Sequence, residues 1–206
     1  MLVVVGGHSR EIGKTSLMCG LIRKLRNRKW TAVKITLYGN DVCSHHGGAC
    51  GCEPESGETF ELTEEFERNE TDTGRYLAAG AERSLWLRAP AGQLAQAAGT
   101  VRKILDRSGD VIIESNSVVE LVKPDVFLML LDFGCEDFKP TSMRFLDRAD
   151  AFVIIDRGIN APLWADVARG LWDKKPQFLV KPPVYATPAV AEFVRSKLAA
   201  APSAAS

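Results

Sequence analysis

Residues 3–17, VVVGGHSREIGKTSL, constrain the fold more than any other stretch of this chain of 206 residues. A short apolar run rich in β-branched residues is typical of a strand that is buried on both faces. Gly7 and the triplet Gly13-Lys14-Thr15 follow, and then apolar residues recur at helical spacing as far as Leu25. The stretch therefore predicts a strand, a glycine loop and an amphipathic helix.

The chemistry of this loop suits a polyphosphate. Glycine lets successive backbone N–H groups turn toward an anion, and the helix that follows adds the positive end of its dipole. Lys14 is expected to reach the terminal phosphates, and the Thr15 hydroxyl to help hold Mg²⁺ between them. A chance glycine turn with a surface lysine is the alternative. The residues expected to bind the nucleotide are Gly7, His8, Ser9, Arg10, Glu11, Ile12, Gly13, Lys14, Thr15 and Ser16.

Apolar strands alternate with helices along the rest of the chain. This alternation predicts an α/β fold, with a mostly parallel sheet that helices cover on both faces. With the glycine loop after the first strand, this arrangement resembles the P-loop NTPase fold. The predicted strands are 2–5, 31–36, 84–87, 110–115, 126–132, 151–156 and 177–180. The predicted helices are 14–29, one beginning at 72, 92–107, 163–173 and 188–200.

Length and charge bound the organisation and the partners. A single domain is expected over 1–200, with a Cys/His-rich insertion at about 37–73 and a disordered tail at 201–206. Lys plus Arg and Asp plus Glu each number 26, so no overall charge favours nucleic acid or an anionic membrane. No apolar stretch reaches the roughly 20 residues that span a bilayer. A soluble, cytoplasmic protein is expected.

Charged residues at strand ends are candidates for chemistry, because ligands of parallel sheets bind beyond the carboxyl ends of the strands. Glu114, Asp132 and Asp156 each end a predicted strand and are expected to converge there. Glu114 is the candidate ligand for Mg²⁺, directly or through water, and a capping acid at the sheet edge is the alternative. Lys34 ends the second strand and is either a functional or a structural lysine.

The five residues between Gly7 and Gly13 resemble the phosphate loop of dethiobiotin synthetase and its relatives, which is one residue longer than the usual loop. In that superfamily the chain is similar to the molybdopterin-guanine dinucleotide biosynthesis adaptor (MobB). The similarity covers about residues 1–120 and lies in Lys34 of AVKIT, SHHGG at 44–48 and TDTGRYLAAGAE at 71–82.

The resemblance implies a Mg²⁺-dependent NTPase that hydrolyses GTP or ATP slowly and supports assembly of a molybdenum or other metal cofactor. It implies a cofactor-assembly protein as partner and a homodimer paired across the nucleotide face. It also implies that Lys34 meets substrate and phosphate. Arg10 is the candidate for a catalytic arginine within the loop.

Two further stretches resemble the nickel-insertion GTPases of hydrogenase and urease. They are DVIIESNSVVELVKPD, which contains Glu114, and FLDRADAFVIIDRGIN, where Asp156-Arg157 stands in place of Asn-Lys. Asp156 is therefore a candidate for binding guanine, and GTP is only weakly favoured over ATP. The alternatives are a metal-binding chaperone or sensor GTPase, and an ATP-dependent ligase or kinase similar to dethiobiotin synthetase.

The insertion contains CSHHGGACGC, whose thiols and imidazoles are typical ligands of Zn²⁺ and other borderline or soft ions. Zinc is the first choice, and an iron–sulfur cluster that also uses Cys135 or Cys19 is the second. A loop with accidental cysteines is the third interpretation, and Cys19 is expected in the core. The candidate metal ligands are Cys43, His45, His46, Cys50 and Cys52.

Overall fold

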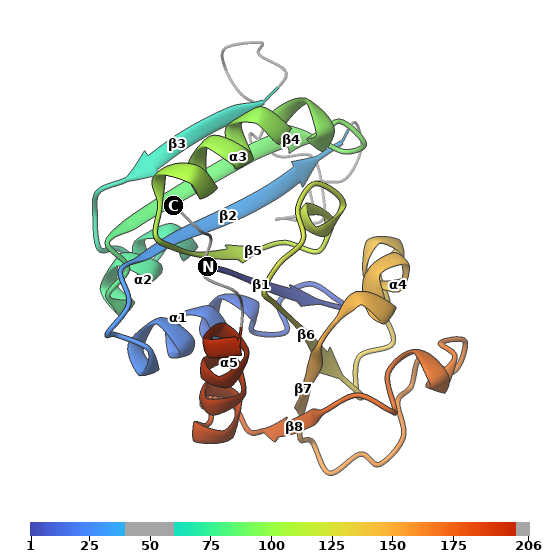
Figure 1. Ribbon diagram of the computed structural model, residues 1–206. Helices are drawn as coiled ribbons and strands as arrows, with labels where there is room; N and C mark the ends of the chain where they lie inside the picture. Colours follow the sequence, from blue (N-terminus) through green and yellow to red (C-terminus); the bar gives the residue numbers. More distant parts are fainter. Residues whose placement is uncertain (40–59, 201–206) are drawn as a thin grey trace.

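A sheet of eight strands forms the centre of the computed structural model, which describes residues 1–39 and 60–200 (Figure 1). The strand order is β3-β4-β2-β5-β1-β6-β7-β8. All neighbouring strands are parallel except β3, which is antiparallel to β4. The strands are β1 (Leu2–Gly7), β2 (Trp30–Tyr38), β3 (Glu61–Glu65), β4 (Arg83–Pro90), β5 (Asp110–Glu114), β6 (Val126–Asp132), β7 (Ala151–Ile155) and β8 (Gln177–Val180).

Helices cover both faces of the sheet (Figure 1). Helices α1, α2 and α5 pack on one face, and α3 and α4 on the other. The α-helices are α1 (Lys14–Lys24), α2 (Asp72–Ala79), α3 (Ala98–Arg107), α4 (Pro140–Phe145) and α5 (Pro188–Ala200). Short 3₁₀ helices are η1 (Leu94–Ala97), η2 (Ser117–Glu120), η3 (Leu146–Arg148) and η4 (Arg169–Leu171). The predicted α/β class, a mostly parallel sheet that helices cover on both faces, is confirmed.

The central strand β1 contributes to both cores. Val3 and Val5 face the core under α1, and Leu2 and Val4 face the core under α3, because alternate side chains of a strand point to opposite faces. All four are buried, as expected for an interior parallel strand. This burial on both faces fixes the position where the chain leaves β1 and enters the phosphate loop.

The loop ends in a left-handed residue, Gly13, which caps α1 with φ of 98°. A β-carbon at Gly13 would lie 2.3 Å from the ring of Tyr185, so glycine is required by both conformation and space. Helix α1 ends at Lys24, earlier than predicted, with Arg23 and Lys24 at the negative end of its dipole.

Three elements differ from the predictions. Strand β3 and helix α4 were not predicted, and the predicted helix over 163–173 is wrong. That segment consists of turns with the short η4, and both Trp164 and Trp172 are buried. The two indoles anchor the segment to the core, and Gly170 disfavours a continuous helix between them.

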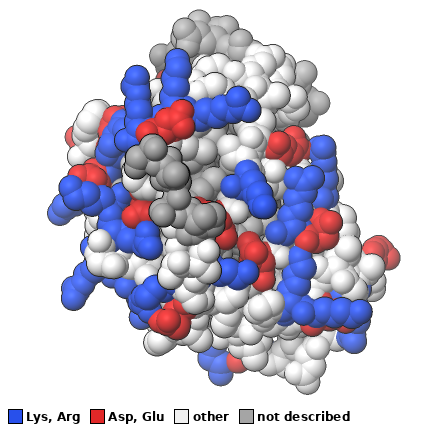
Figure 2. Space-filling model, viewed as in Figure 1, with Lys and Arg blue, Asp and Glu red and all other residues white. Residues whose placement is uncertain are grey.

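The surface agrees with the balanced composition. Figure 2 shows basic and acidic side chains interspersed on the face it presents. No helix in the described parts of the chain is long and apolar enough to cross a bilayer.

Candidate functional site

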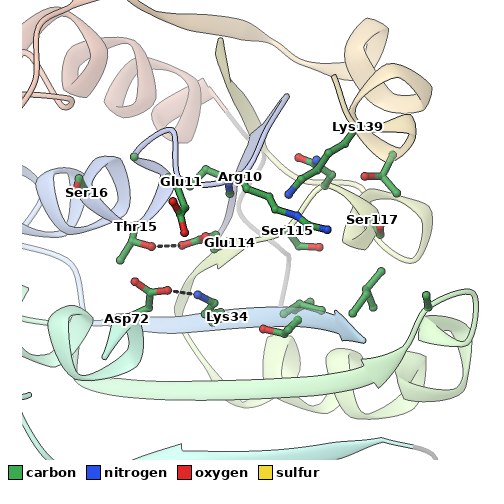
Figure 3. A pocket seen from close by; sticks show the side chains of 18 of the residues that line it. Arg10, Glu11, Thr15, Ser16, Lys34, Asp72, Glu114, Ser115, Ser117 and Lys139 are labelled. Carbon is green, nitrogen blue, oxygen red and sulfur yellow. Dashed lines mark hydrogen bonds and ion pairs between the residues drawn. The ribbon is translucent and has the colours of Figure 1, made fainter. Parts of the chain in front are cut away.

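A pocket of about 710 Å³ lies beyond the carboxyl ends of β1, β2 and β5 (Figure 3). Its walls come from the phosphate loop and α1, the end of β2, α2, the residues after β5 and the start of α4. The residues that line it are Arg10, Glu11, Gly13, Lys14, Thr15, Ser16, Lys34, Ile35, Thr36, Leu37, Gly39, Asp72, Arg75, Ala91, Glu114, Ser115, Asn116, Ser117, Lys139, Pro140, Thr141 and Tyr185.

The phosphate loop presents unpaired backbone donors. Within the described parts of the chain, no acceptor is found for the amides of residues 9–16. These amides include the first N–H groups of α1, which have no acceptor within the helix, and the capping residue Gly13 has no side chain that could accept from them. Free N–H groups at the positive end of a helix form an anion site. The arrangement can therefore bind phosphate oxygens.

Lys14 lies folded across this loop. Its Nζ donates to the carbonyl oxygen of Ser9 at 2.9 Å. Burial lowers the pKa of Lys14, and the negative charge of Glu114 opposes that shift. One neutral carbonyl is a weak partner for a buried ammonium, so an anion entering the pocket would be a better one.

Glu114 connects the end of β5 to α1 and α2. The Thr15 hydroxyl donates to Glu114 Oε2 at 2.8 Å, and the Tyr76 hydroxyl donates to the same oxygen at 2.5 Å. Burial, together with the negative charge of Glu114, raises the pKa of Tyr76 well above its ordinary value, which keeps this hydroxyl a donor. The carboxylate is thus held in place beside Thr15 (Figure 3).

Thr15 and Glu114 fit a magnesium ion. A hydroxyl and a carboxylate are hard oxygen donors, and both line the pocket next to the loop amides. Mg²⁺ is held in such sites by few protein ligands together with phosphates and waters. When bound, it would neutralise phosphate charge and orient the terminal phosphates.

A second set of charges lies on the α2 side of the pocket. Lys34 forms an ion pair with Asp72 (Figure 3). Asp72 also accepts from Arg75 at 3.5 Å. Arg75 donates in turn to the hydroxyl of Ser16 at 3.1 Å. Lys34 therefore lines the pocket, and the carboxylate of Asp72 already pairs with its ammonium.

Two residues that the sequence analysis did not identify fix the start of the loop. Asn116 accepts from the Gly7 amide at 2.8 Å and donates to the Gly7 carbonyl at 3.0 Å. The Ser142 hydroxyl donates to the same carbonyl at 2.8 Å and lies 2.7 Å from the Asn116 amide nitrogen. Asn116 comes two residues after Glu114, so its place at a strand end was the available signal; Ser142 had none.

Three predicted loop contacts point away from the pocket. His8 is fully buried, its Nδ1 lies 3.0 Å from the Asp137 carbonyl, and its Nε2 accepts from the Asp132 amide at 2.9 Å. The Ser9 hydroxyl donates to the Asp137 carboxylate at 2.6 Å. Ile12 packs in the core under α1. These side chains shape the loop from behind.

The two other strand-end acids are not part of the pocket lining. Asp132 is held by Arg157, whose Nη2 lies 2.7 Å from its carboxylate. Asp156 lies beside Lys181 at 3.4 Å and accepts from the Gly158 amide. The convergence expected from the sequence therefore extends to Glu114 alone among the three acids.

The predicted metal-binding cluster, residues 43–52, lies outside the described residues. Over 1–39 and 60–200, no group of three or more potential metal-ligating side chains comes together. Cys19 is buried under α1, as expected, and Cys135 is partly exposed beyond β6.

No family model and no curated protein sequence matches the chain. Among solved structures, it is similar to HypB from Helicobacter pylori in complex with nickel, at 16% identity and a TM-score of 0.49, over 99% of this chain and 90% of that one. It is also similar to the "apo" form of LpxK from Aquifex aeolicus in complex with ATP, at 15% identity and a TM-score of 0.48, over 86% of this chain and 53% of that one. Likeness at this level concerns the general arrangement of the elements and does not bear on ligands.

Proposed function

We propose that this protein binds a nucleoside triphosphate with Mg²⁺ and hydrolyses it slowly. One observation carries the proposal: one pocket of about 710 Å³ is lined by most of the loop residues 10–16, whose amides have no acceptor in the described parts of the chain, together with Lys14 and the Thr15–Glu114 pair. These are the donors that a triphosphate and its magnesium ion require.

The charge of each residue determines whether it binds the phosphates or the metal ion. The loop amides and Lys14 neutralise the β- and γ-phosphates, and Lys14 leaves the Ser9 carbonyl to do so. Thr15 and Glu114 hold the metal ion. A water molecule would attack the γ-phosphate in line, and Arg10 is the arginine of the loop that lines the pocket. Arg75 is held by Asp72 and Ser16, so turnover is expected to be slow without a partner.

We infer a supporting role in metal-cofactor assembly, of the kind that the adaptor resemblance implies. The stretch 71–82 carries that resemblance, and two of its residues, Asp72 and Arg75, line the pocket. A cofactor-assembly protein as partner and a homodimer belong to the same proposal. Size-exclusion chromatography with light scattering, with and without nucleotide, tests the dimer.

Replacing Lys14 by Ala tests the nucleotide site. We expect the affinities for labelled GTP and ATP with Mg²⁺ to fall on the order of 100-fold, because a charge-assisted contact to each terminal phosphate is lost. Lys24→Ala, at the exposed end of α1, is the matched control and should bind as wild type. Unchanged affinity of Lys14→Ala for both nucleotides would refute the proposal.

Phosphoryl transfer to a second substrate is the alternative favoured by Lys34. Its ion pair with Asp72 lies in the pocket, and the lining continues past it along the end of β2 to Gly39. Turnover that requires a small carboxylate or alcohol would favour this ligase or kinase activity over hydrolysis.

A metal-handling switch is the alternative favoured by the sequence CSHHGGACGC at 43–52. Zn²⁺ or an iron–sulfur cluster would bind there, and the nucleotide state would alter the site. Elemental analysis and an optical spectrum of protein purified without chelator or affinity tag test it. Stoichiometric metal that changes with nucleotide supports the switch, and metal-free protein opposes it.

A further inference from the structure

Lys139, the residue before α4, lines the pocket from the β6 side, where no motif assigned a function (Figure 3). We propose that Lys139 binds the terminal phosphate of the nucleoside triphosphate and so lets the protein distinguish triphosphate from diphosphate. This inference rests on the proposed function and adds a ligand-sensing residue to its site.

The backbone of Lys139 is attached to the phosphate loop. Its N–H donates to the carbonyl oxygen of His8 at 2.9 Å. The hydroxyl of Ser142, one turn further along, donates to the carbonyls of Gly7 and His8 at 2.8 and 3.2 Å. The start of α4 therefore keeps a fixed position relative to the loop, and the Lys139 side chain extends into the pocket from it.

The ammonium of Lys139 has no acidic partner within salt-bridge distance in the described parts of the chain. Burial and the positive charges of Lys14 and Arg10 lower its pKa to about 8, although Asp137 and Glu114 act in the opposite direction. The side chains of Lys139, Lys14 and Arg10 thus face one space, and among them, over residues 1–39 and 60–200, only Lys14 has a hydrogen-bond acceptor, a neutral carbonyl. An anion of high charge would relieve this repulsion.

The neighbours of Lys139 indicate which phosphate it meets. The two loop residues whose charges repel Lys139 are Lys14 and Arg10, and in the proposed function Lys14 binds the terminal phosphates. The charge of Glu114, the candidate magnesium ligand, attracts Lys139. Lys139 is therefore placed to contact the γ-phosphate, which the diphosphate lacks.

The test compares dissociation constants of Lys139→Ala and wild type for non-hydrolysable GTP and ATP analogues and for GDP and ADP, with Mg²⁺. We expect triphosphate binding to weaken about 10-fold and diphosphate binding to change less than about 2-fold. Retained diphosphate binding shows that the loop is intact. Lys103→Ala, exposed on α3, is the control and should leave both affinities unchanged.

The pH dependence gives a second measurement. Between pH 7 and 9 wild type should lose triphosphate affinity as Lys139 deprotonates, whereas Lys139→Arg, which stays charged, should lose less. Lys14 is present in both proteins, so its own titration cancels in the comparison.

Each result has one meaning. Equal weakening of triphosphate and diphosphate, or no weakening of either, overturns the role of Lys139 while the proposed function stands. If wild type binds no nucleotide, both the proposed function and this inference fail.

Discussion

The carboxyl edge of the sheet differs between the two sides of the central strand β1. Toward β5 and β2 it opens into the pocket, where Glu114 holds Thr15 and Tyr76. Toward β6 and β7 it is filled, because Phe133, Phe138 and Trp164 pack around the imidazole of His8 and each other. The same edge of the sheet therefore carries a pocket on one side of β1 and a packed core on the other.

The acids at the ends of β5 and β6 differ accordingly. In the described parts of the chain, the carboxylate of Glu114 accepts from two hydroxyl groups, those of Thr15 and Tyr76, and has no cationic partner. Such a carboxylate can bind a metal ion in place of these contacts. Asp132 accepts from Arg157 through Nε and Nη2 and from the Gly134 amide, and the Trp164 indole donates to its carbonyl. A strand end thus brings an acid to the edge, and the loop that follows decides whether it faces ligand or protein.

The largest expected effect separates these two acids. Glu114→Gln should slow Mg²⁺-dependent hydrolysis about 100-fold, because the ion loses a charged ligand. Its stability should change little, since the amide oxygen still accepts from Thr15 and Tyr76. Hydrolysis rates over a magnesium titration and the thermal midpoint Tm measure both effects.

Asp132→Asn is the matched control on the other flank. It should keep hydrolysis and lower Tm, because its contacts are with Arg157 and Gly134 rather than with the pocket. If Asp132→Asn lost hydrolysis as strongly as Glu114→Gln, the two flanks would not be functionally distinct.

The next effect is on stability. Arg157→Ala leaves the carboxylate of Asp132, 3% exposed, without its cation and should cost about 1 to 2 kcal/mol at pH 7. We expect the lower part of the range of costs known for unpaired buried charges, because the Arg157 side chain is 56% exposed and water screens its charge. Urea unfolding measures the loss, and Asp156→Asn, next in sequence and partly exposed beside Lys181, should cause a smaller change.

The pH dependence of that loss has a definite sign. Burial alone would raise the pKa of Asp132, but hydrogen bonds from Arg157 and Gly134 and the charge of Arg157 lower it below its ordinary value. A lowered pKa contributes stability above the unfolded pKa of roughly 4, and this stability is lost as the pH falls through the folded value. The gap between wild type and Arg157→Ala should therefore narrow below about pH 4. A constant gap would contradict this account of Arg157.

The elements that could be predicted depend on local pattern. Strand β1 and helix α1 follow from an apolar run, a glycine loop and helical spacing, all within residues 2–25. Lys14, Thr15 and Glu114 line one pocket because parallel strands deliver their ends to one edge. Neither inference needs knowledge of distant contacts.

The elements that could not be predicted depend on distant partners. Strand β3 lies in an acid-rich run and pairs across to β4, where Arg83 and Arg88 meet Glu64 and Glu61. Lys139 entered no motif, and its relevance arises only when β6 brings it against a loop that is more than a hundred residues earlier. The spacing of apolar residues over 163–173 suits a helix, but burial of two indoles decides the path instead.

His8 illustrates the boundary between the flanks, and it gives the smallest predicted effect. It lies in the phosphate loop by sequence, yet its ring belongs to the filled flank. Burial lowers the pKa of His8, against the opposing influence of the Asp137 carbonyl and the Asp132 charge. The neutral form is required because Nε2 must accept from the Asp132 amide, and a protonated imidazole has no acceptor.

Stability should therefore decline modestly as the pH falls from 7.5 to 5.5. In that window the unfolded chain binds a proton at His8 below about pH 6.5, whereas the folded chain resists it, so the free energy of unfolding decreases. His8→Gln, which can still donate and accept but does not titrate, should show a flatter dependence in urea unfolding at the two pH values. An equal dependence of the unfolding free energy on pH in both proteins would mean that His8 takes up a proton in the folded state as readily as in the unfolded chain. The contacts of His8 with Asp132 and Asp137 would then not hold the loop in place.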